Sequence, residues 1–412
     1  MSPIDRRTFL KGGLGAAGMV GAASFPFTRV ERAAAAPIPP KPERFLVVID
    51  MAGGNDGYST VIPANSGAYR DLRPTVAIPN SQSLPFEDGL RLHPSLAKLA
   101  SQRMAVLEGI GTPDPDLSHF EMLRRWWQGD EDGTQGFALG GTGFLGRVCD
   151  VIGNPDAPAA GVSIGFAPSA MLVASQVRTL AVDPTGTGGF PGSEDPVWIA
   201  AQQAMAPDPE VPEANGMLLA ARRGNATALG VDEMIATLPP ADDVAHPYPS
   251  TGLGLQLRLA SRIVRAGTAS GVRCVHIPFR GDFDTHVNHK ARHTTLMTEL
   301  DNALDPFLTE MKAQGLLNHV VVATISEFGR RPEQNSNGLD HGAASAALLF
   351  GSVRGRVHGD RPRFRKLDPN GNLVPTVLMS EYYASLAKWM GARPDDVLPG
   401  APRAISGMIR YH

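Results

Sequence analysis

Cysteine and long apolar runs are both scarce in this chain of 412 residues. The 2 cysteines, Cys149 and Cys274, lie far apart, with no spacing typical of a disulfide framework or a thiolate metal site. Two buried free thiols are the simpler expectation, and a disulfide is the alternative. After the N-terminal region, no segment approaches the roughly 18 uncharged apolar residues of a membrane helix. We therefore expect a soluble mature protein with no permanent membrane span.

Positive charge is also not in excess. The chain has 38 Lys and Arg against 41 Asp and Glu, a formal net charge of −3. Because no basic surplus is present to attract a phosphate backbone, nucleic acid is not an expected partner. Glycine and proline are abundant, at 45 and 35 residues. This content predicts long, shaped loops on a folded core.

The first 36 residues have the order of a targeting segment. Paired arginines, Arg6 and Arg7, are followed by an apolar stretch from Gly12 to Phe27 and an alanine run that ends at Ala36. The apolar stretch is shorter than the roughly 20 residues that span a bilayer, so a cleaved signal is favoured over an anchor. A retained amphiphilic N-terminus is the alternative.

This pattern is typical of twin-arginine signals. It predicts the twin-arginine translocase as a partner during export and a periplasmic or extracellular location. Such signals often accompany proteins that fold around a metal or cofactor before they cross the membrane.

Apolar runs of strand length alternate with helical patterns along the rest of the chain. We expect strands at 45–50, 104–110, 272–277, 319–325 and 346–351, and helices from 118, at 253–266, at 292–314 and at 380–390. This order predicts an α/β fold, with a mostly parallel central sheet and helices on both of its faces.

The domain expected from this pattern covers residues 43–395, with a C-terminal tail at 396–412. Between about 133 and 250 the pattern is weaker and indicates an insertion or cap. Pro-rich spacers at 207–212 and 239–249 and short helices at 197–205 and 217–223 are expected within it.

Polar residues follow every expected strand, where ligands bind in open parallel sheets. In chain order they are Asp50 and Asp56, Ser118 and His119, Asp284 and His286, Glu327 and Arg330, and Asp340 and His341. Carboxylates and imidazoles without thiolates suit one or two divalent ions such as Zn, Mn, Mg or Ca.

These residues suggest roles in ester cleavage. The expected metal ligands are Asp50 or Asp56, which share one loop, together with Asp284, His286, Glu327, Asp340 and His341. A hydroxyl at a helix start is well placed as a nucleophile, which makes Ser118 the candidate. His119 is expected to act beside it as a ligand or an acid/base, and Arg330 or Arg124 to steady an anion.

Each of these positions also has an ordinary structural interpretation. Asp56-Gly57 could be a turn, Ser118 a helix cap paired with Glu121, Asp284-Thr285-His286 an Asx turn, and Glu327 a salt-bridge partner of a following arginine. His289 and His293 are expected on the surface of the next helix. The conjunction of the polar residues, more than any single one, supports a metal centre.

Six short motifs resemble the exported bacterial family known as domain of unknown function 1501. They are Gly53-Gly54-Asn55-Asp56-Gly57, Leu92-His93-Pro94, Ser118-His119-Phe120, Phe283-Asp284-Thr285-His286, Ser326-Glu327-Phe328-Gly329-Arg330 and Asp340-His341-Gly342. That family is similar in fold to the alkaline phosphatase and sulfatase superfamily. The resemblance implies a metal centre at the carboxyl edge of the sheet and cleavage of phosphate or sulfate esters.

Two departures from the superfamily pattern limit this inference. The sulfatase nucleophile motif follows neither Cys149 nor Cys274, which disfavours a formylglycine sulfatase. Glu327-Phe328 stands where the superfamily usually has Asp-His, so a complete two-metal centre is in doubt.

The sequence therefore predicts an exported metal-dependent hydrolase of phosphate or related sulfate esters, with a small or polymeric anionic substrate. The alternative is a non-catalytic exported binding or assembly protein that keeps the fold and binds a carbohydrate or surface polymer. A sulfatase that uses Ser118 is a third possibility.

Overall fold

The computed structural model describes residues 43–411, except 136–138, 166, 186–196, 198–199, 201–229, 231 and 241–246. The expected signal peptide and the spacer at 207–212 lie outside the described residues, as does nearly all of the expected helices at 197–205 and 217–223. Residues 42–190 and 230–412 form one compact unit, to which the following description applies. Among the described residues, no helix combines the length and apolar character of a membrane span.

A nine-stranded sheet runs through this unit in the order β13-β5-β12-β9-β1-β8-β6-β7, with β14 paired to β5. Its strands are β1 (Phe45–Asp50), β5 (Met104–Gly111), β6 (Gly161–Ile164), β7 (Thr179–Val182), β8 (Cys274–Pro278), β9 (Val320–Ile325), β12 (Ala344–Gly351), β13 (Val357–His358) and β14 (Val377–Leu378). Only β12 is antiparallel to its neighbours within this sheet, and the other pairings are parallel. The predicted fold class is confirmed.

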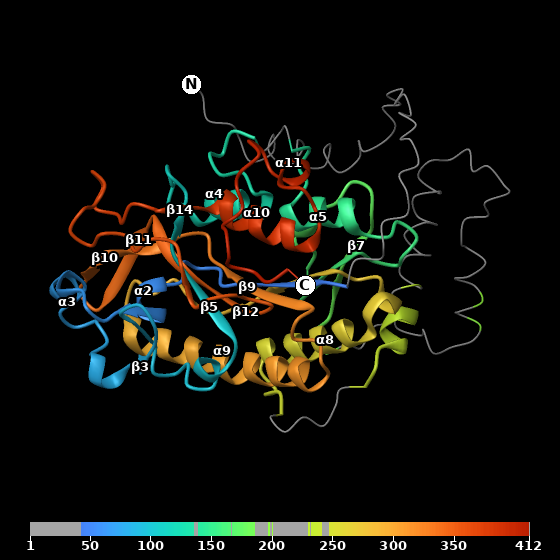
Figure 1. Cartoon of the computed structure of the whole chain (residues 1–412), viewed down its shortest axis with the longest axis horizontal. Helices are drawn as coiled ribbons and strands as arrows, with labels where there is room; N and C mark the ends of the chain where they lie inside the picture. Colours follow the sequence, from blue (N-terminus) through green and yellow to red (C-terminus); the bar gives the residue numbers. More distant parts are fainter. Residues whose placement is uncertain are drawn as a thin grey trace, which may run out of the picture. The chain divides into compact units, whose positions relative to one another are not determined.

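Helices pack on both faces of the sheet (Figure 1). Helices α8 (Gly252–Ala266) and α9 (His289–Ala313) share a core with Val47 and Ile49 of β1. The opposite face, with Leu46 and Val48, packs against α4 (His119–Gln128), α5 (Phe144–Ile152) and α10 (Met379–Met390). Because successive strand residues point to opposite faces, the apolar run of β1 contributes to two cores.

Shorter elements surround this sheet. They are α2 (Gly57–Thr60), β2 (Val61–Pro63), α3 (Gly67–Leu72), β3 (Leu84–Pro85), β4 (Leu90–Leu92), β10 (Gly329–Asn335), β11 (Gly338–Gly342), α11 (Pro394–Val397) and 3₁₀ turns at Asn80–Gln82, Leu99–Ser101, Ala170–Leu172 and Gly267–Ser270. Strands β2, β4 and β3 form a small separate sheet.

A hairpin replaces the loop expected between the fourth strand and His341. Strands β10 and β11 pair in antiparallel fashion around a turn in which Ser336 has a φ of 55°. The sequence Asn335-Ser336-Asn337-Gly338 is rich in residues that tolerate such turns. The hairpin brings His341 back towards the start of β10.

The range expected as an insertion also contributes to the central sheet. Strands β6 and β7 pair next to β8, although each has only four residues, too few to give a clear sequence pattern. The expected C-terminal tail packs on the core, because Met408 and Ile409 are buried and Ile409 bridges to Val353. Both cysteines are buried and free.

Two glycines that each begin a short helix provide a matched test of packing. A Cβ at Gly57 would lie 2.2 Å from the backbone nitrogen of Ala346, whereas a Cβ at Gly67 would contact nothing within 4 Å. We predict that Gly57→Ala lowers the free energy of unfolding by about 2 kcal/mol or more through overpacking. Gly67→Ala should change it by no more than about 0.5 kcal/mol. Equal effects in urea titrations of the two variants would contradict this packing.

Candidate metal centre

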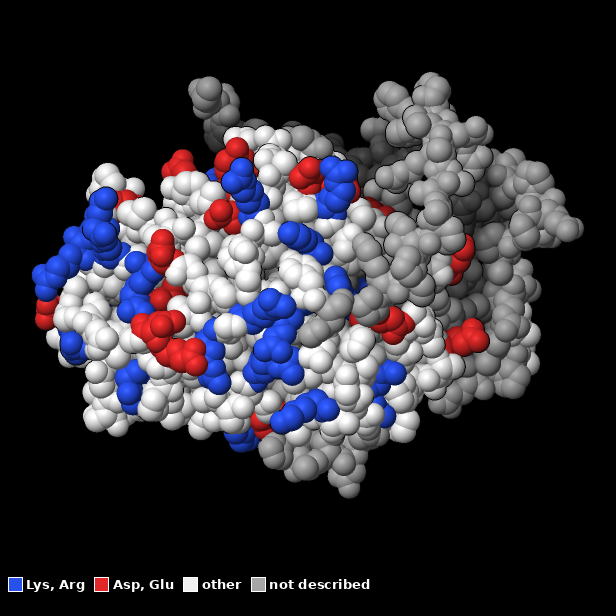
Figure 2. All heavy atoms as spheres, viewed as in Figure 1, with Lys and Arg blue, Asp and Glu red and all other residues white. Residues whose placement is uncertain are grey.

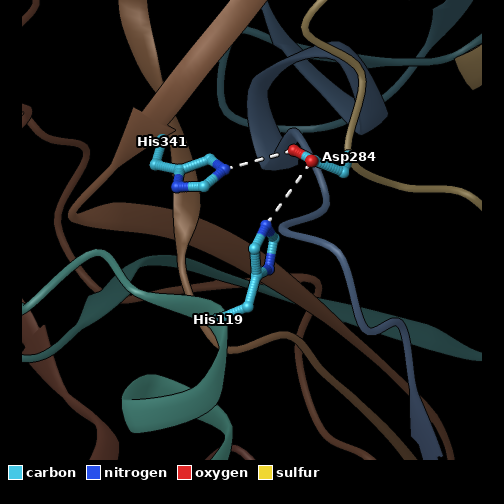
Figure 3. Close-up of side chains that lie close together, drawn as sticks. All are labelled: His119, Asp284 and His341. Atoms are coloured by element: carbon cyan, nitrogen blue, oxygen red, sulfur yellow. Dashed lines mark hydrogen bonds and ion pairs between the residues drawn. The ribbon is translucent and has the colours of Figure 1, made fainter.

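Four side chains from three separate segments meet at the carboxyl edge of the sheet. His119 begins α4, Asp284 and His286 lie in the loop between β8 and α9, and His341 lies on β11. Figure 3 shows the imidazoles of His119 and His341 directed at the carboxylate of Asp284. One ligand atom from each of these three residues lies within 4.8 Å of the others.

The contacts converge on the two oxygens of Asp284. Oδ1 lies 3.1 Å from Nε2 of His341 and 3.1 Å from Nε2 of His286, and Oδ2 lies 3.5 Å from Nε2 of His119. The Nε2 atoms of His286 and His341 are themselves 3.0 Å apart. His119, His341 and Asp284 therefore converge on one point, and His286 adjoins it through its contacts with Asp284 and His341.

The second nitrogen of each imidazole faces a group that can only accept a hydrogen bond. Nδ1 of His341 lies 2.8 Å from the Leu117 carbonyl, Nδ1 of His119 lies 2.7 Å from Oε1 of Glu327, and Nδ1 of His286 lies 3.1 Å from Oδ1 of Asp340. Donation from each Nδ1 to its acceptor would leave Nε2 of a neutral ring with a lone pair for a cation.

Nε2 of each ring also faces the Asp284 carboxylate, so a proton or a cation must lie between each of these nitrogens and the carboxylate oxygens. At most one proton can lie between Nε2 of His286 and Nε2 of His341. A divalent cation would accept all three nitrogens and an oxygen of Asp284, and a protein group on the other nitrogen is the usual support of a metal-binding histidine. The donor set therefore fits a metal ion.

Glu327 is buried at the end of β9 and supports this arrangement. Its Oε1 accepts hydrogen bonds from the backbone N–H of Gly53 at 2.8 Å and from Nδ1 of His119. The hydrogen bond to Glu327 raises the pKa of His119 above its usual value. Glu327 thus faces the distal nitrogen of His119, away from Nε2. Asp340 has the same relation to His286.

Arg330 is buried and does not face solvent at this site. Its guanidinium donates to the carbonyls of Gly53, Gly54, Phe283 and Leu339 and to Oδ1 of Asp284, the last at 2.8 Å. The expectation that Arg330 steadies a substrate anion does not fit this placement. It is a positioning residue that connects three loops.

Asp284 is about one-third exposed and strongly acidic. Partial burial raises the pKa of its carboxyl, but the hydrogen bond and charge of Arg330, with His341 and His286, outweigh burial and lower it to about 2. The carboxylate is therefore ionised across the physiological pH range and available to a cation.

Phe328 forms the apolar wall of the site. Its ring centroid lies 4.4 Å from that of His341 and 4.9 Å from that of His119. A Cβ on Gly54 would meet the Phe328 ring at 2.4 Å, so only glycine fits beneath it. Phe328, one of the two residues that depart from the superfamily pattern, thus packs against the imidazoles of His119 and His341.

Ser118 is the N-cap residue of α4, but its side chain makes no capping hydrogen bond. Glu121, the expected partner in a capping box, instead pairs with Arg124 and Arg125. The preceding Leu117 has a φ of 62°, a costly conformation for a non-glycine residue, and its carbonyl accepts from His341. The Ser118 hydroxyl is therefore not committed to the helix.

Three other expected residues lie apart from the four-residue cluster. Oδ2 of Asp50 accepts from the Trp127 indole at 2.8 Å and lies 3.4 Å from His276. Arg124 is occupied by Glu121 and Asp130.

Asp56, the third, forms a buried ion pair with Arg73 at 2.6 Å. Burial alone would raise the pKa of Asp56, but Arg73 and His289 hold it well below its usual range.

His289 and His293, expected on a helix surface, are both buried, which corrects that expectation. They stack with ring centroids 5.0 Å apart, and His93 packs edge-on against His293. Nδ1 of His289 lies 2.8 Å from the Thr285 hydroxyl, between Asp284 and His286 in sequence. α9 begins three residues earlier than expected, so these histidines belong to its first, inward-facing turns.

Some contributors carried no sequence signal. The carbonyl of Leu117 and the N–H of Gly53 are backbone groups, and the role of Phe328 depends on packing across loops. Arg73 lies outside every recognised motif. Only the conformation of the folded chain reveals these contacts.

Residues 242–386 match the family described as "Protein of unknown function (DUF1501)". The resemblance expected from the short motifs is confirmed over this part of the chain, which includes Asp284, His286, Glu327 and His341. No curated protein matches the chain in sequence.

Several solved structures are similar to the chain. A protein in the alkaline phosphatase superfamily from Vibrio parahaemolyticus has a TM-score of 0.41 and 10% identity, covering 87% of this chain and 70% of its own. The PsFucS1 sulfatase from Pseudoalteromonas sp. has a TM-score of 0.38 and 11% identity, with coverages of 90% and 74%. A lipooligosaccharide phosphoethanolamine transferase from Neisseria meningitidis has a TM-score of 0.38 and 11% identity, covering 97% of this chain and 66% of its own.

The buried histidines predict acid sensitivity. Burial lowers the pKa of His93 to about 4, below the value of about 6.5 in an unfolded chain. Between these values the unfolded chain binds more protons, so the free energy of unfolding falls as pH decreases from about 6.5 towards 4. We expect a loss of about 2 kcal/mol between pH 7.5 and 5 from His93. Urea titrations of His93→Gln should show a shallower dependence, and an unchanged slope would contradict the assignment.

Proposed function

We propose that this chain is a metal-dependent hydrolase of phosphate or related anionic esters, in which His119, Asp284, His286 and His341 hold one divalent cation. The observation that carries this proposal is the convergence of three Nε2 atoms on the Asp284 carboxylate. Each imidazole is oriented by an acceptor on its other nitrogen. Nitrogen-rich ligation with one carboxylate favours Zn or Mn over Mg or Ca.

When bound, the cation would act as a Lewis acid that draws electron density from an ester oxygen and stabilises charge in the transition state. The protein supplies orientation. Leu117, Glu327 and Asp340 fix the three rings, Arg330 fixes Asp284, and Phe328 excludes water behind His119 and His341. Glu327 and Asp340, predicted as ligands, are assigned to this supporting role.

Ser118 is the proposed nucleophile. Its hydroxyl is free of capping contacts, and the residue directly precedes His119 at the N-terminus of a ten-residue helix. The Ser118 Oγ–P bond forms as the P–O bond to the leaving alcohol breaks, and the serine proton passes to that alcohol. Water then breaks the Oγ–P bond, which releases phosphate and restores the hydroxyl. A sulfate ester would follow the same sequence at sulfur.

The non-catalytic alternative has one observation in its favour. Both arginines expected to steady a substrate anion are engaged within the protein, Arg330 by carbonyls and Asp284, and Arg124 by Glu121 and Asp130. If neither of these two guanidinium groups contacts the substrate, the metal cation and the N-terminus of α4 would have to stabilise its negative charge. A chain of this kind could bind a carbohydrate or surface polymer without turnover.

Export is proposed from the leader sequence alone. The paired Arg6 and Arg7, the apolar stretch and the alanine run up to Ala36 suggest passage through the twin-arginine translocase and cleavage near Ala36. The periplasm or the extracellular space is then the proposed location.

The cation site has a direct test by elemental analysis. We expect protein purified without chelator to contain about one equivalent of Zn or Mn, and His341→Ala to contain little, because that change removes one of four ligands. His358→Ala, which alters a histidine of β13 outside the cluster, is the matched control. Equal metal content in wild type and both variants, or none in any of them after Zn and Mn are supplied, would overturn the site.

Glu327→Gln tests the support of His119 separately. A neutral amide is a weaker acceptor for the Nδ1 proton, so the affinity for metal should fall about 10-fold or more while folding is retained. Competition with a chromogenic chelator measures this change. Unchanged affinity would show that Glu327 does not act through His119.

Ser118→Ala separates hydrolysis from binding. This variant should retain the full metal content and lose at least about 100-fold in turnover of an aryl phosphate or aryl sulfate. If the wild type binds metal but cleaves neither ester, the hydrolase proposal fails and the binding protein is favoured. If wild type and Ser118→Ala are equally active, another group is the nucleophile.

A further inference from the structure

The amino edge of the central sheet, at the opposite end from the candidate metal centre, carries a cluster of cations. Its members are Arg44 before β1, Arg103 before β5, Arg273 before β8, Arg354 after β12, Lys388 in α10 and Arg410 near the C-terminus. We call them the amino-edge cations. Figure 2 shows Lys and Arg side chains gathered in the middle of one face of the molecule, where the ends of β5 and β12 lie in Figure 1.

Tyr411 stands among one half of these cations. The Arg44 guanidinium lies 5.9 Å from the centre of the Tyr411 ring, and the Lys388 ammonium lies 5.8 Å from it. Nε of Arg273 donates to the carbonyl of Arg44 at 2.9 Å. Tyr411 is exposed. An exposed aromatic ring with a polar tip therefore lies beside two positive charges, with Arg273 next to one of them.

The other half adjoins the same C-terminal segment. The N–H of Arg354 donates to the carbonyl of Met408, and the N–H of Arg410 donates to the carbonyl of Ser352. Burial and then the charge of Arg410 lower the pKa of Arg103. The C-terminal segment thus places Arg410 near Arg103 and Arg354.

Five of the amino-edge cations lack a carboxylate partner in the described part of the chain. Among the described residues, Arg103, Arg273, Arg354, Lys388 and Arg410 form no ion pair with a carboxylate, whereas Arg356, Arg361 and Arg365 in neighbouring loops each do. Glu43 is the acid next to Arg44 in sequence. Like charges held together without counter-charges raise the energy of the folded chain, and an external anionic surface would offset that cost.

We propose that the amino-edge cations and Tyr411 form a docking surface for an anionic bilayer. The inference does not depend on the metal centre. Both cations and tyrosine favour the interface of a bilayer with acidic headgroups. The sheet strands are roughly 20 Å long at about 3.3 Å per residue, so a chain docked by its amino edge presents the carboxyl edge away from the membrane.

The breadth of the cluster favours a bilayer over a soluble polyanion. The cations come from six separate places in the sequence, as a broad surface requires, and not from one groove.

Sedimentation of the full-length chain with lipid vesicles tests this inference. We expect binding to vesicles that contain 30% phosphatidylglycerol at 0.1 M salt, little binding to pure phosphatidylcholine, and loss of binding at 0.5 M salt. Arg103→Gln/Arg354→Gln/Lys388→Gln should bind roughly 150-fold more weakly, since each surface cation contributes about 1 kcal/mol. Arg354→Gln/Lys388→Gln, which alters only exposed side chains, guards against misfolding and should bind about 30-fold more weakly.

The matched control is Arg365→Gln/Arg393→Gln/Arg403→Gln, which removes the same charge from exposed positions elsewhere. It should bind acidic vesicles like the wild type. If the control and cluster variants lost vesicle binding equally, the net charge of the protein would explain the binding, and the proposal would be overturned. So would binding to pure phosphatidylcholine, which would point to the leader alone. A cluster variant that loses binding to soluble polyphosphate but keeps vesicle binding would assign the surface to a polymer instead.

Discussion

The guanidinium of Arg330 sets the geometry on which the candidate site depends. It is buried, and it donates to carbonyls in the loop after β1, the loop after β8 and strand β11. A buried guanidinium is costly unless its donors are satisfied and its charge is compensated, and Asp284 supplies the compensating charge. Because the Asp284 carboxylate is held from one side by Arg330, its oxygens face the three imidazoles on the other. Loss of the Arg330 guanidinium would release the two loops and β11 together.

The second constraint is the tautomer of each histidine. A carbonyl or carboxylate faces Nδ1 of His119, His286 and His341, so each ring presents Nε2 to the same point. A cation among these nitrogens would offset the repulsion between the neutral rings. The parallel direction of β1, β8 and β9 places all of the contributing loops at one edge, while the amino-edge cations collect at the other. Sheet polarity therefore separates the proposed chemistry from the proposed membrane contact.

Much of the fold followed from local patterns. Apolar runs such as 45–50 and 319–325 are too long and too uniform for loops, and the expected strands there differ from β1 and β9 by no more than one residue. The rule that ligands gather at the carboxyl ends of strands also identified Asp284, His286 and His341 as candidate ligands from the sequence. Strands β6 and β7 were not predicted, because four residues are too few to show a clear hydrophobic period.

The division of roles within the site could not follow from sequence. Asp50 and Asp56 both occupy the expected loop, yet Trp127 and Arg73, distant in sequence, bind them. His289 and His293 have the spacing of one helix face, but the sequence does not state which face meets the core. Glu327 faces Nδ1 of His119 because the loop at Gly53 lies against it. Such distinctions depend on contacts between segments far apart in the chain.

Crystals of the protein grown with Zn, measured above and below the Zn absorption edge, would test the central claim most directly. The account predicts one strong anomalous peak in contact with Nε2 of His119, His286 and His341 and with the carboxylate of Asp284, and no ligation through any Nδ1. A peak at Asp56, at Asp50, or at Nδ1 of these histidines would contradict it. So would an empty cluster in crystals whose Zn is bound elsewhere.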